Sequence, residues 1–173
     1  MPMQICVLTD VRLSSIAEWQ KAIDAEGFPL RLSDPDPNRN LAAQLGDQET
    51  SIEYGVYGFL ELKETYKHVS FGHDWTYAIT FTWSSDFAEE IASWMAATAY
   101  ARATNGIIFD EQEGKLFTAD QSLLVAREIE RRRPELEAIL RTYVEQLAAE
   151  SPAAEPALRT FMQRRLTKAN EPN

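Results

Sequence analysis

The chain has 173 residues, of which 45% are hydrophobic, 25% charged and 10% aromatic. This size and composition fit one ordinary globular domain, or one domain with a helical appendage, and argue against two full domains. The 17 basic and 27 acidic residues give a formal net charge of −10. That charge argues against DNA or RNA as a partner, because affinity for phosphates comes mainly from Lys and Arg.

Membrane segments and export signals are not evident in the sequence. No stretch approaches the roughly 18 consecutive apolar residues of a membrane span, and no basic region followed by an apolar run opens the chain. The single cysteine, Cys6, cannot form an internal disulfide bond, so nothing indicates an oxidising compartment. We therefore expect a cytoplasmic protein with no membrane partner.

The first third of the chain predicts a strand, a helix, a second strand and a loop. Gln4–Thr9 is a short, mostly apolar run that is typical of a strand buried on both faces. Ser15 and Glu18 have the spacing of a capping box that starts a helix, and Gly27 is suited to end it. The next segments are a strand at Phe28–Leu32, a loop at Ser33–Asn40 rich in Pro, Asp and Asn, and an ambiguous stretch at Leu41–Ser51 that could be a short helix.

The strongest strand patterns lie at Tyr54–Phe71 and Trp75–Trp83, and a turn around Gly72 joins them into a long predicted β-hairpin. Alternation in the second strand places one set of large apolar residues on a single face: Trp75, Tyr77, Ile79, Phe81 and Trp83. Such rings can stack nucleic-acid bases, but the hairpin lacks the positive groove that accompanies stacking. We therefore predict that this face forms the core beneath the helices.

The rest of the chain predicts one more helix, a small hairpin and a helical tail. Asp86 with Glu89 opens the helix, and Asn105–Gly106 closes it. Thr118 with Gln121 forms another capping box, at the start of a tail that Pro134 kinks or restarts. The other predicted elements are short strands at Ile107–Phe109 and Lys115–Phe117, and a last short helix carrying Leu158, Phe161, Met162 and Leu166.

The order of these elements predicts an α+β fold. We expect a mainly antiparallel sheet with two helices on one face, ferredoxin-like or related, plus a C-terminal helical extension. Residues 1–120 would form the α+β domain. Residues 121–173 would form the helical extension, packed on that domain or on a neighbouring subunit.

The negative charge is concentrated in the first part of the chain. Residues 1–120 hold 8 basic and 19 acidic side chains, a net of −11, whereas residues 121–173 hold 9 basic and 8 acidic side chains, a net of +1. A solubilising surface would explain this asymmetry, and so would a basic partner. Our leading hypothesis is a non-enzymatic binding module that meets a basic protein partner through acidic loops around Asp34, Asp36, Asp110, Glu111 and Glu113.

A second hypothesis is a small enzyme or small-molecule binder with a pocket between the sheet and the helical tail. His68, His73 and Asp74 would act there as acid, base or ligand. A third is a homo-oligomer that associates through the C-terminal helices. The run Arg131–Arg133 is either a solvated helix face neutralised by nearby glutamates or a patch that packs on the acidic part of the same or a neighbouring chain.

Known catalytic and cofactor motifs are not evident. The sequence has no Gly-x-Ser-x-Gly elbow, phosphate loop or dinucleotide fingerprint. Cys6 lies in an apolar strand, where cysteine usually behaves as a small buried hydrophobe. Asp34, Asp36 and Asn38 begin like a calcium loop, but the Gly and Glu that the pattern needs are replaced by Arg39 and Leu45. We therefore predict no metal site and no cofactor.

Overall fold

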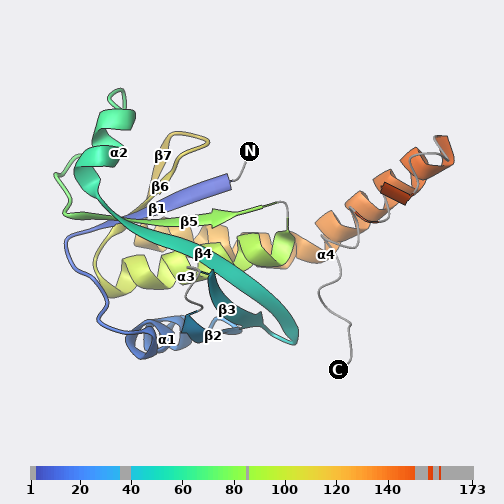
Figure 1. The fold of residues 1–173 in the computed structure, drawn as a ribbon, viewed down its shortest axis with the longest axis horizontal. Helices are drawn as coiled ribbons and strands as arrows, with labels where there is room; N and C mark the ends of the chain where they lie inside the picture. The colour runs from blue at the N-terminus through green and yellow to red at the C-terminus, as the bar shows by residue number, and fades with distance from the viewer. Residues whose placement is uncertain (1–2, 36–39, 85, 151–155, 158–159, 161–173) are drawn as a thin grey trace.

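The computed structural model describes residues 3–35, 40–84, 86–150, 156–157 and 160. Over these residues the chain forms one antiparallel sheet of seven strands together with four helices (Figure 1). The elements in chain order are β1 (Met3–Thr9), α1 (Ile16–Ala25), β2 (Leu30–Pro35), β3 (Asn40–Leu45), β4 (Gln48–Gly58), α2 (Phe59–Thr65), β5 (Tyr77–Trp83), α3 (Phe87–Ala103), β6 (Ile107–Asp110), β7 (Lys115–Thr118) and α4 (Ala119–Glu150).

The strand order of the sheet is β2-β3-β4-β5-β1-β6-β7. The interior strand β1 pairs with β5 along its whole length, from Met3 opposite Trp83 to Thr9 opposite Tyr77, and with β6 on its other side. The predicted α+β class, the antiparallel sheet and a C-terminal helical extension are therefore confirmed. None of the described helices combines the length and the hydropathy that crossing a membrane requires.

At the starts of α1 and α4, side chains accept hydrogen bonds from backbone N–H groups that the helix itself leaves free. Thr118 Oγ1 accepts from the Gln121 N–H (3.2 Å) while Gln121 Oε1 accepts from the Thr118 N–H (2.9 Å), a complete capping box. At α1, Ser15 Oγ accepts from the Glu18 N–H (3.1 Å). The Glu18 carboxylate accepts from Ser14 instead of from the Ser15 N–H, so this predicted box is only half formed.

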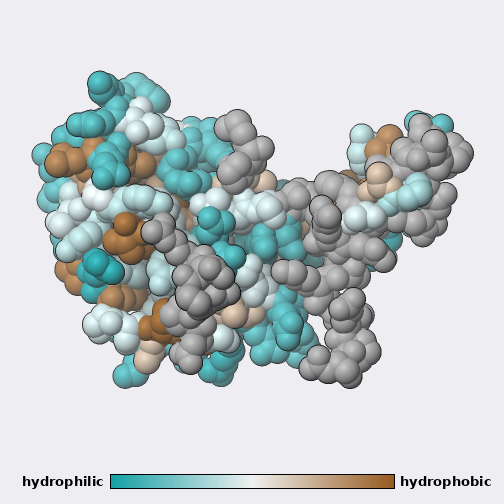
Figure 2. All heavy atoms as spheres, viewed as in Figure 1, coloured by the Kyte–Doolittle hydropathy of each residue, from teal (hydrophilic) through white to brown (hydrophobic). Residues whose placement is uncertain are grey.

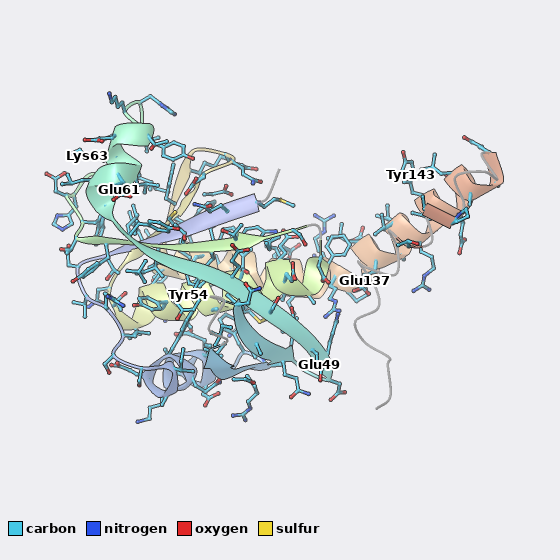
Figure 3. All side chains as sticks on the ribbon, in the orientation of Figure 1. Glu49, Tyr54, Glu61, Lys63, Glu137 and Tyr143 are labelled. Atoms are coloured by element: carbon cyan, nitrogen blue, oxygen red, sulfur yellow. The ribbon has the colours of Figure 1, made fainter. Side chains whose placement is uncertain are left out.

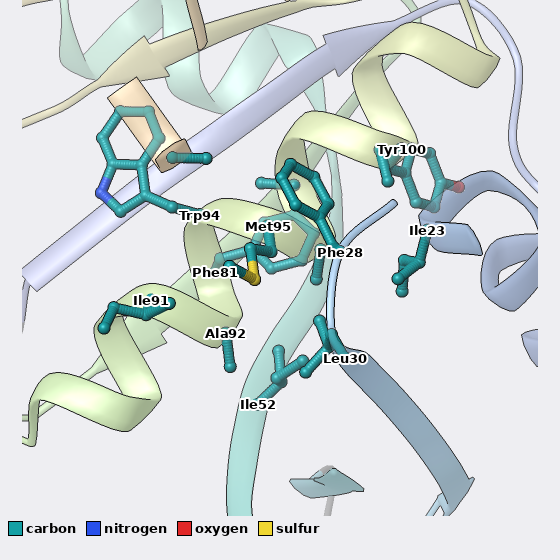
Figure 4. Close-up of a cluster of buried hydrophobic side chains, with 14 of the residues drawn as sticks. Ile23, Phe28, Leu30, Ile52, Phe81, Ile91, Ala92, Trp94, Met95 and Tyr100 are labelled. Atoms are coloured by element: carbon teal, nitrogen blue, oxygen red, sulfur yellow. The ribbon is translucent and has the colours of Figure 1, made fainter. Parts of the chain in front are cut away.

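The first face of the sheet, which carries Ile5, Val7 and Phe81, holds the larger core (Figure 4). Helix α3 packs directly on this face and is buried almost all round, with α1 against one side and the start of α4 against another. Trp19 of α1 makes edge-on contacts with three aromatic rings and donates its indole N–H to the Ala96 carbonyl of α3 (3.0 Å). This single side chain ties α1 to both the sheet and α3.

The predicted strand at Tyr54–Phe71 is wrong beyond Gly58, because α2 follows there. Phe59, Leu62 and Tyr66 recur at helical spacing and pack on the sheet, which favours a helix over a strand. Strands β4 and β5 still pair antiparallel, but α2 and a loop connect them in place of one turn. Trp75 precedes β5 and packs with the residues around α2, so it does not share the face of Phe81.

The short helix considered for Leu41–Ser51 is also wrong. Strands β3 and β4 occupy this stretch, and their register runs from Asn40 opposite Glu53 to Leu45 opposite Gln48. Alternate residues of β3 are buried against the core, which is the strand period. Strand β2 extends as far as Pro35, inside the segment predicted as a loop, and its register with β3 shifts between Leu32 and Pro35.

The tail from residue 119 to residue 150 is one continuous helix that contains Pro134. Of the two outcomes expected at this proline, a kink or a restart, the restart is wrong. Ion pairs within the helix flank this proline: Arg131 binds Glu128 (2.6 Å) and Arg133 binds Glu137 (2.7 Å). These are the pairs expected for a solvated, mixed-charge helix face. Leu158, Phe161, Met162 and Leu166 of the predicted last helix lie outside the described residues.

Candidate functional site

The second face of the sheet carries Gln4, Cys6 and Thr80, and it is only partly covered. Helix α2 and the loop after it pack over one part of this face as a small aromatic core, in which Phe71 contacts both Phe59 and Phe109 edge-on, each at 5.2 Å between ring centroids. The uncovered part forms a pocket of about 450 Å³ beside α2. The pocket is lined by Gln4, Glu53, Tyr54, Gly55, Tyr57, Glu61, Leu62, Thr65, Tyr66, Ala78, Thr80, Thr82 and Glu111.

Glu111 accepts three side-chain hydrogen bonds in the pocket. Its Oε1 accepts from Gln4 Nε2 (2.7 Å) and from Cys6 Sγ (2.8 Å), and its Oε2 accepts from the Tyr66 hydroxyl (2.6 Å). Gln4 is itself oriented, since its Oε1 accepts from Thr82 Oγ1 (3.4 Å). Three neutral donors therefore fix the carboxylate in place without neutralising its charge.

Burial and the neighbouring carboxylate keep two of these donors protonated. The pKa of the Cys6 thiol is raised well above its ordinary value, first by burial and then by Glu111. The pKa of Tyr66 is also raised, again by burial first and then by its hydrogen bond to Glu111. Because a thiolate is the nucleophilic form of cysteine, Cys6 is suited to donate a hydrogen bond and not to attack a substrate.

The raised pKa of Cys6 predicts a loss of stability in alkali. The stability that comes from the protonated thiol is fully present below the unfolded pKa of about 8.5 and is lost as the pH rises toward the folded pKa. We expect the free energy of unfolding to fall by up to about 1.4 kcal/mol per pH unit above that point. Urea unfolding at a series of pH values should show a flatter profile for Cys6→Ala. Equal slopes for the two proteins would contradict this assignment.

The pocket is acidic and partly aromatic. Three carboxylates line it, those of Glu53, Glu61 and Glu111, and its described lining contains no Lys, Arg or His. Glu61 lies on α2, over which hydrophilic residues gather (Figures 2 and 3). Tyr57 lies close over Gly55, where a Cβ atom would approach the tyrosine ring to 2.6 Å. The glycine therefore leaves room for an aromatic ring on the floor of the pocket.

The predicted acidic loops are only partly brought together. The Asp110 side chain accepts from the backbone N–H groups of Gln112 (2.9 Å) and Glu113 (3.2 Å), and it therefore stabilises the turn between β6 and β7. Glu113 pairs with Lys115 (2.5 Å), whereas Glu111 turns inward to the pocket. The side chain of Asp34 and all of Asp36 lie outside the described residues. Binding of a basic protein through these loops stays a prediction.

The structure gives different partners to the three predicted acid, base or ligand residues. His73 Nε2 binds Asp10 Oδ2 (2.8 Å), and Asp74 pairs with Lys63 (2.5 Å). His68 lies beside the Tyr66 ring, at 6.3 Å between centroids. All three are exposed, and none of them lines the pocket. Within the described residues, no group of three or more His, Cys, Asp or Glu side chains is placed to hold a metal ion.

Several pocket residues were not predicted from the sequence. Gln4 and Cys6 share a face because they alternate along β1, a signal that the sequence does contain. Nothing local indicated that Glu111, 107 residues after Gln4, would meet it. Glu61 was not identified as a candidate site residue, because its segment was interpreted as a strand.

Comparisons of the chain with protein-family models, with curated proteins and with solved structures found no match. The fold and the pocket therefore define the protein in general terms only, as an α+β protein with an acidic pocket on the second face of its sheet. Any more specific function has to be inferred from the chemistry of that pocket.

Proposed function

We propose that this protein binds a small organic cation in the pocket between the second face of the sheet and α2. The observation that carries the proposal is the pairing of a concave site with three carboxylates and no basic side chain in its described lining. Ligand sites in proteins are typically concave and contain a few convergent polar groups. This version of the small-molecule hypothesis uses Glu53, Glu61 and Glu111 in place of the two histidines and Asp74.

The charge of the pocket supports a cationic ligand. Carboxylates gathered in a cleft create a negative potential that concentrates positively charged ligands. Gln4, Cys6 and Tyr66 already orient Glu111 as an acceptor, so binding an ammonium group there requires little reorganisation. Fixed acceptors raise affinity because less freedom is lost on binding.

Aromatic rings in the pocket support the same class of ligand. Tyr57 and Tyr66 both line it, and the face of an aromatic ring attracts a cation within about 6 Å of its centroid. An alkyl chain that carries amino groups would use the apolar part of the lining as well, notably Leu62 and Ala78. A flexible polyamine has both properties, and we choose spermidine as the probe because its three amino groups match the three carboxylates.

We also propose that β1, α1, β4, β5, α3 and β6 form a ferredoxin-like core with further elements added to it. The strand order β4-β5-β1-β6, with α1 following β1 and α3 following β5, supports this proposal. In this description α2 is an insertion between β4 and β5. The insertion adds a wall to a sheet face that would otherwise be open, and thereby creates the pocket.

A matched pair of glutamates on α2 tests the proposed site. Glu61 lines the pocket, whereas Glu64 on the same helix does not, and both side chains are exposed. We expect Glu61→Gln to weaken spermidine binding by up to about fivefold, the effect of removing one solvent-exposed ion pair. Glu64→Gln should leave the affinity nearly unchanged. Isothermal titration calorimetry at low ionic strength measures both.

The comparison separates a specific site from the general negative field of the protein. If both variants weaken binding equally, spermidine responds only to net charge and the pocket is not its site. If neither variant has an effect while spermidine still binds, the cation is held elsewhere. Either result would overturn the proposal.

A further inference from the structure

Helix α4 extends well beyond the body of the protein. Its first half packs on α3, β7 and β6, and the side chain of Arg133 reaches Gln48 at the start of β4. After Pro134 the helix projects away from the sheet as an arm (Figure 1). The arm is helical as far as Glu150, a length of about 25 Å from Pro134 at 1.5 Å per residue.

One line of residues along this arm has the spacing of a coiled-coil seam. Successive members are four and then three residues apart in turn. This is the spacing that places residues on one face of a supercoiled helix. We call this line the arm stripe, and it consists of Arg132, Leu136, Ile139, Tyr143, Gln146 and Glu150. The two apolar residues at its centre, Ile139 and Tyr143, are each 57% exposed.

The charges of the arm stripe are arranged with opposite signs at its two ends. Arg132 lies seven residues before Ile139, and Glu150 lies seven residues after Tyr143. Both end residues are exposed, although Arg132 also pairs with Glu135 of its own helix (3.5 Å). If two copies of the helix cross antiparallel, Ile139 of each copy meets Tyr143 of the other, and Arg132 of each copy meets Glu150 of the other. The same register places Leu136 of each copy beside Gln146 of the other. A parallel crossing would instead place Arg132 on Arg132 and Glu150 on Glu150.

We infer that the arm stripe binds a second copy of this chain in an antiparallel, two-fold symmetric pair. The arm stripe is self-complementary under a two-fold axis between Ile139 and Tyr143, which is what an isologous interface requires. Two exposed apolar side chains per copy leave the water, and two symmetric ion pairs set the direction of the crossing. The occupant is therefore a second identical helix, and this inference is independent of the pocket.

Charge reversal on the full-length protein tests this pairing. We expect Arg132→Glu or Glu150→Arg alone to weaken self-association about tenfold, because each change affects both symmetric contacts. The double variant Arg132→Glu/Glu150→Arg should restore the original dimer, since the opposite charges again face each other. Sedimentation velocity over a range of protein concentrations measures the dimer fraction.

Apolar variants supply the matched control. Ile139→Asn should weaken the dimer by at least about tenfold. Leu124→Asn changes another exposed residue of α4, 70% exposed and outside the arm stripe, and should leave the dimer unaffected.

A protein that is monomeric at every concentration overturns the inference, as does a dimer that survives Ile139→Asn. Failure of the double reversal to restore association would overturn the antiparallel arrangement. If the protein is monomeric and Ile139→Asn lowers its melting temperature, the chain itself covers the stripe.

Discussion

Replacing Glu111 with Gln is expected to abolish most spermidine binding and to lower the free energy of unfolding by about 1–3 kcal/mol. The glutamine side chain has one acceptor and one donor group where the carboxylate has two acceptors. Gln4, Cys6 and Tyr66 all donate to Glu111, so at least one donor would face another donor. The pocket also loses the carboxylate that the protein orients most firmly.

The control for this variant is Glu113→Gln on the same turn. Glu113 forms an exposed ion pair with Lys115, and such pairs contribute between about 0 and 1 kcal/mol. Urea unfolding and calorimetry on both variants separate the two sites. A Glu111→Gln protein that is as stable as the unmodified protein and binds spermidine equally well would show that Glu111 has neither role.

Replacing Trp19 with Ala is expected to cost about 3–5 kcal/mol of stability, the range found for large aromatic residues removed from cores. Trp19 is buried, contacts Tyr54, Phe81 and Tyr100 edge-on, and donates its indole N–H to α3. Its removal leaves a cavity where α1, α3 and the sheet meet. The Ala96 carbonyl loses this donor.

Urea unfolding followed by circular dichroism measures this loss, since other tryptophans complicate the use of fluorescence. Leu60→Ala on α2 is a suitable comparison because Leu60 is 70% exposed, and exposed positions usually change stability by less than about 0.5 kcal/mol. The loss for Trp19→Ala would be a large part of the roughly 5–15 kcal/mol that stabilises a typical domain. A change below about 1 kcal/mol would show that Trp19 does not hold these elements together.

Elements whose signal is local were predicted well. The capping box at Thr118 and Gln121 follows from residues three positions apart, and strand β5 follows from a clear alternation in the sequence. The start of α3 at Asp86 is also local, because its side chain accepts from the Ala88 N–H (2.7 Å). Such contacts form in the same way whatever the rest of the chain does.

Elements whose signal is ambiguous were predicted poorly. The alanines at 42 and 43 weaken the strand pattern of β3, although Leu41 and Leu45 are buried as a strand requires. In α2, aromatic and apolar residues at helical spacing were interpreted as the continuation of a strand. Short apolar segments can take either structure, and packing on the rest of the fold decides between them.

The candidate site depended on contacts that no local pattern reveals. Glu111 was predicted as a binding residue because of its charge, but its donors Gln4, Cys6 and Tyr66 come from β1 and from the end of α2. His73 and Asp74 were chosen because they are adjacent to each other, yet each binds a different partner. Proximity in sequence therefore did not indicate convergence in space.

The uneven charge of the chain has a more specific meaning in the structure. The acidic first part of the sequence includes three carboxylates that share one pocket. In the nearly neutral C-terminal part, arginines pair with glutamates along α4. The same asymmetry that suggested a basic protein partner is thus compatible with a small cationic ligand.

Calorimetric titration of the unmodified protein with spermidine, and separately with citrate, tests the central claim most directly. We predict that spermidine binds at one site per chain and that added salt weakens the binding, because the interaction is between opposite charges. Citrate should produce no binding heat. Binding of citrate with equal affinity, or no binding of spermidine at low ionic strength, would contradict the proposal of an acidic, cation-binding pocket.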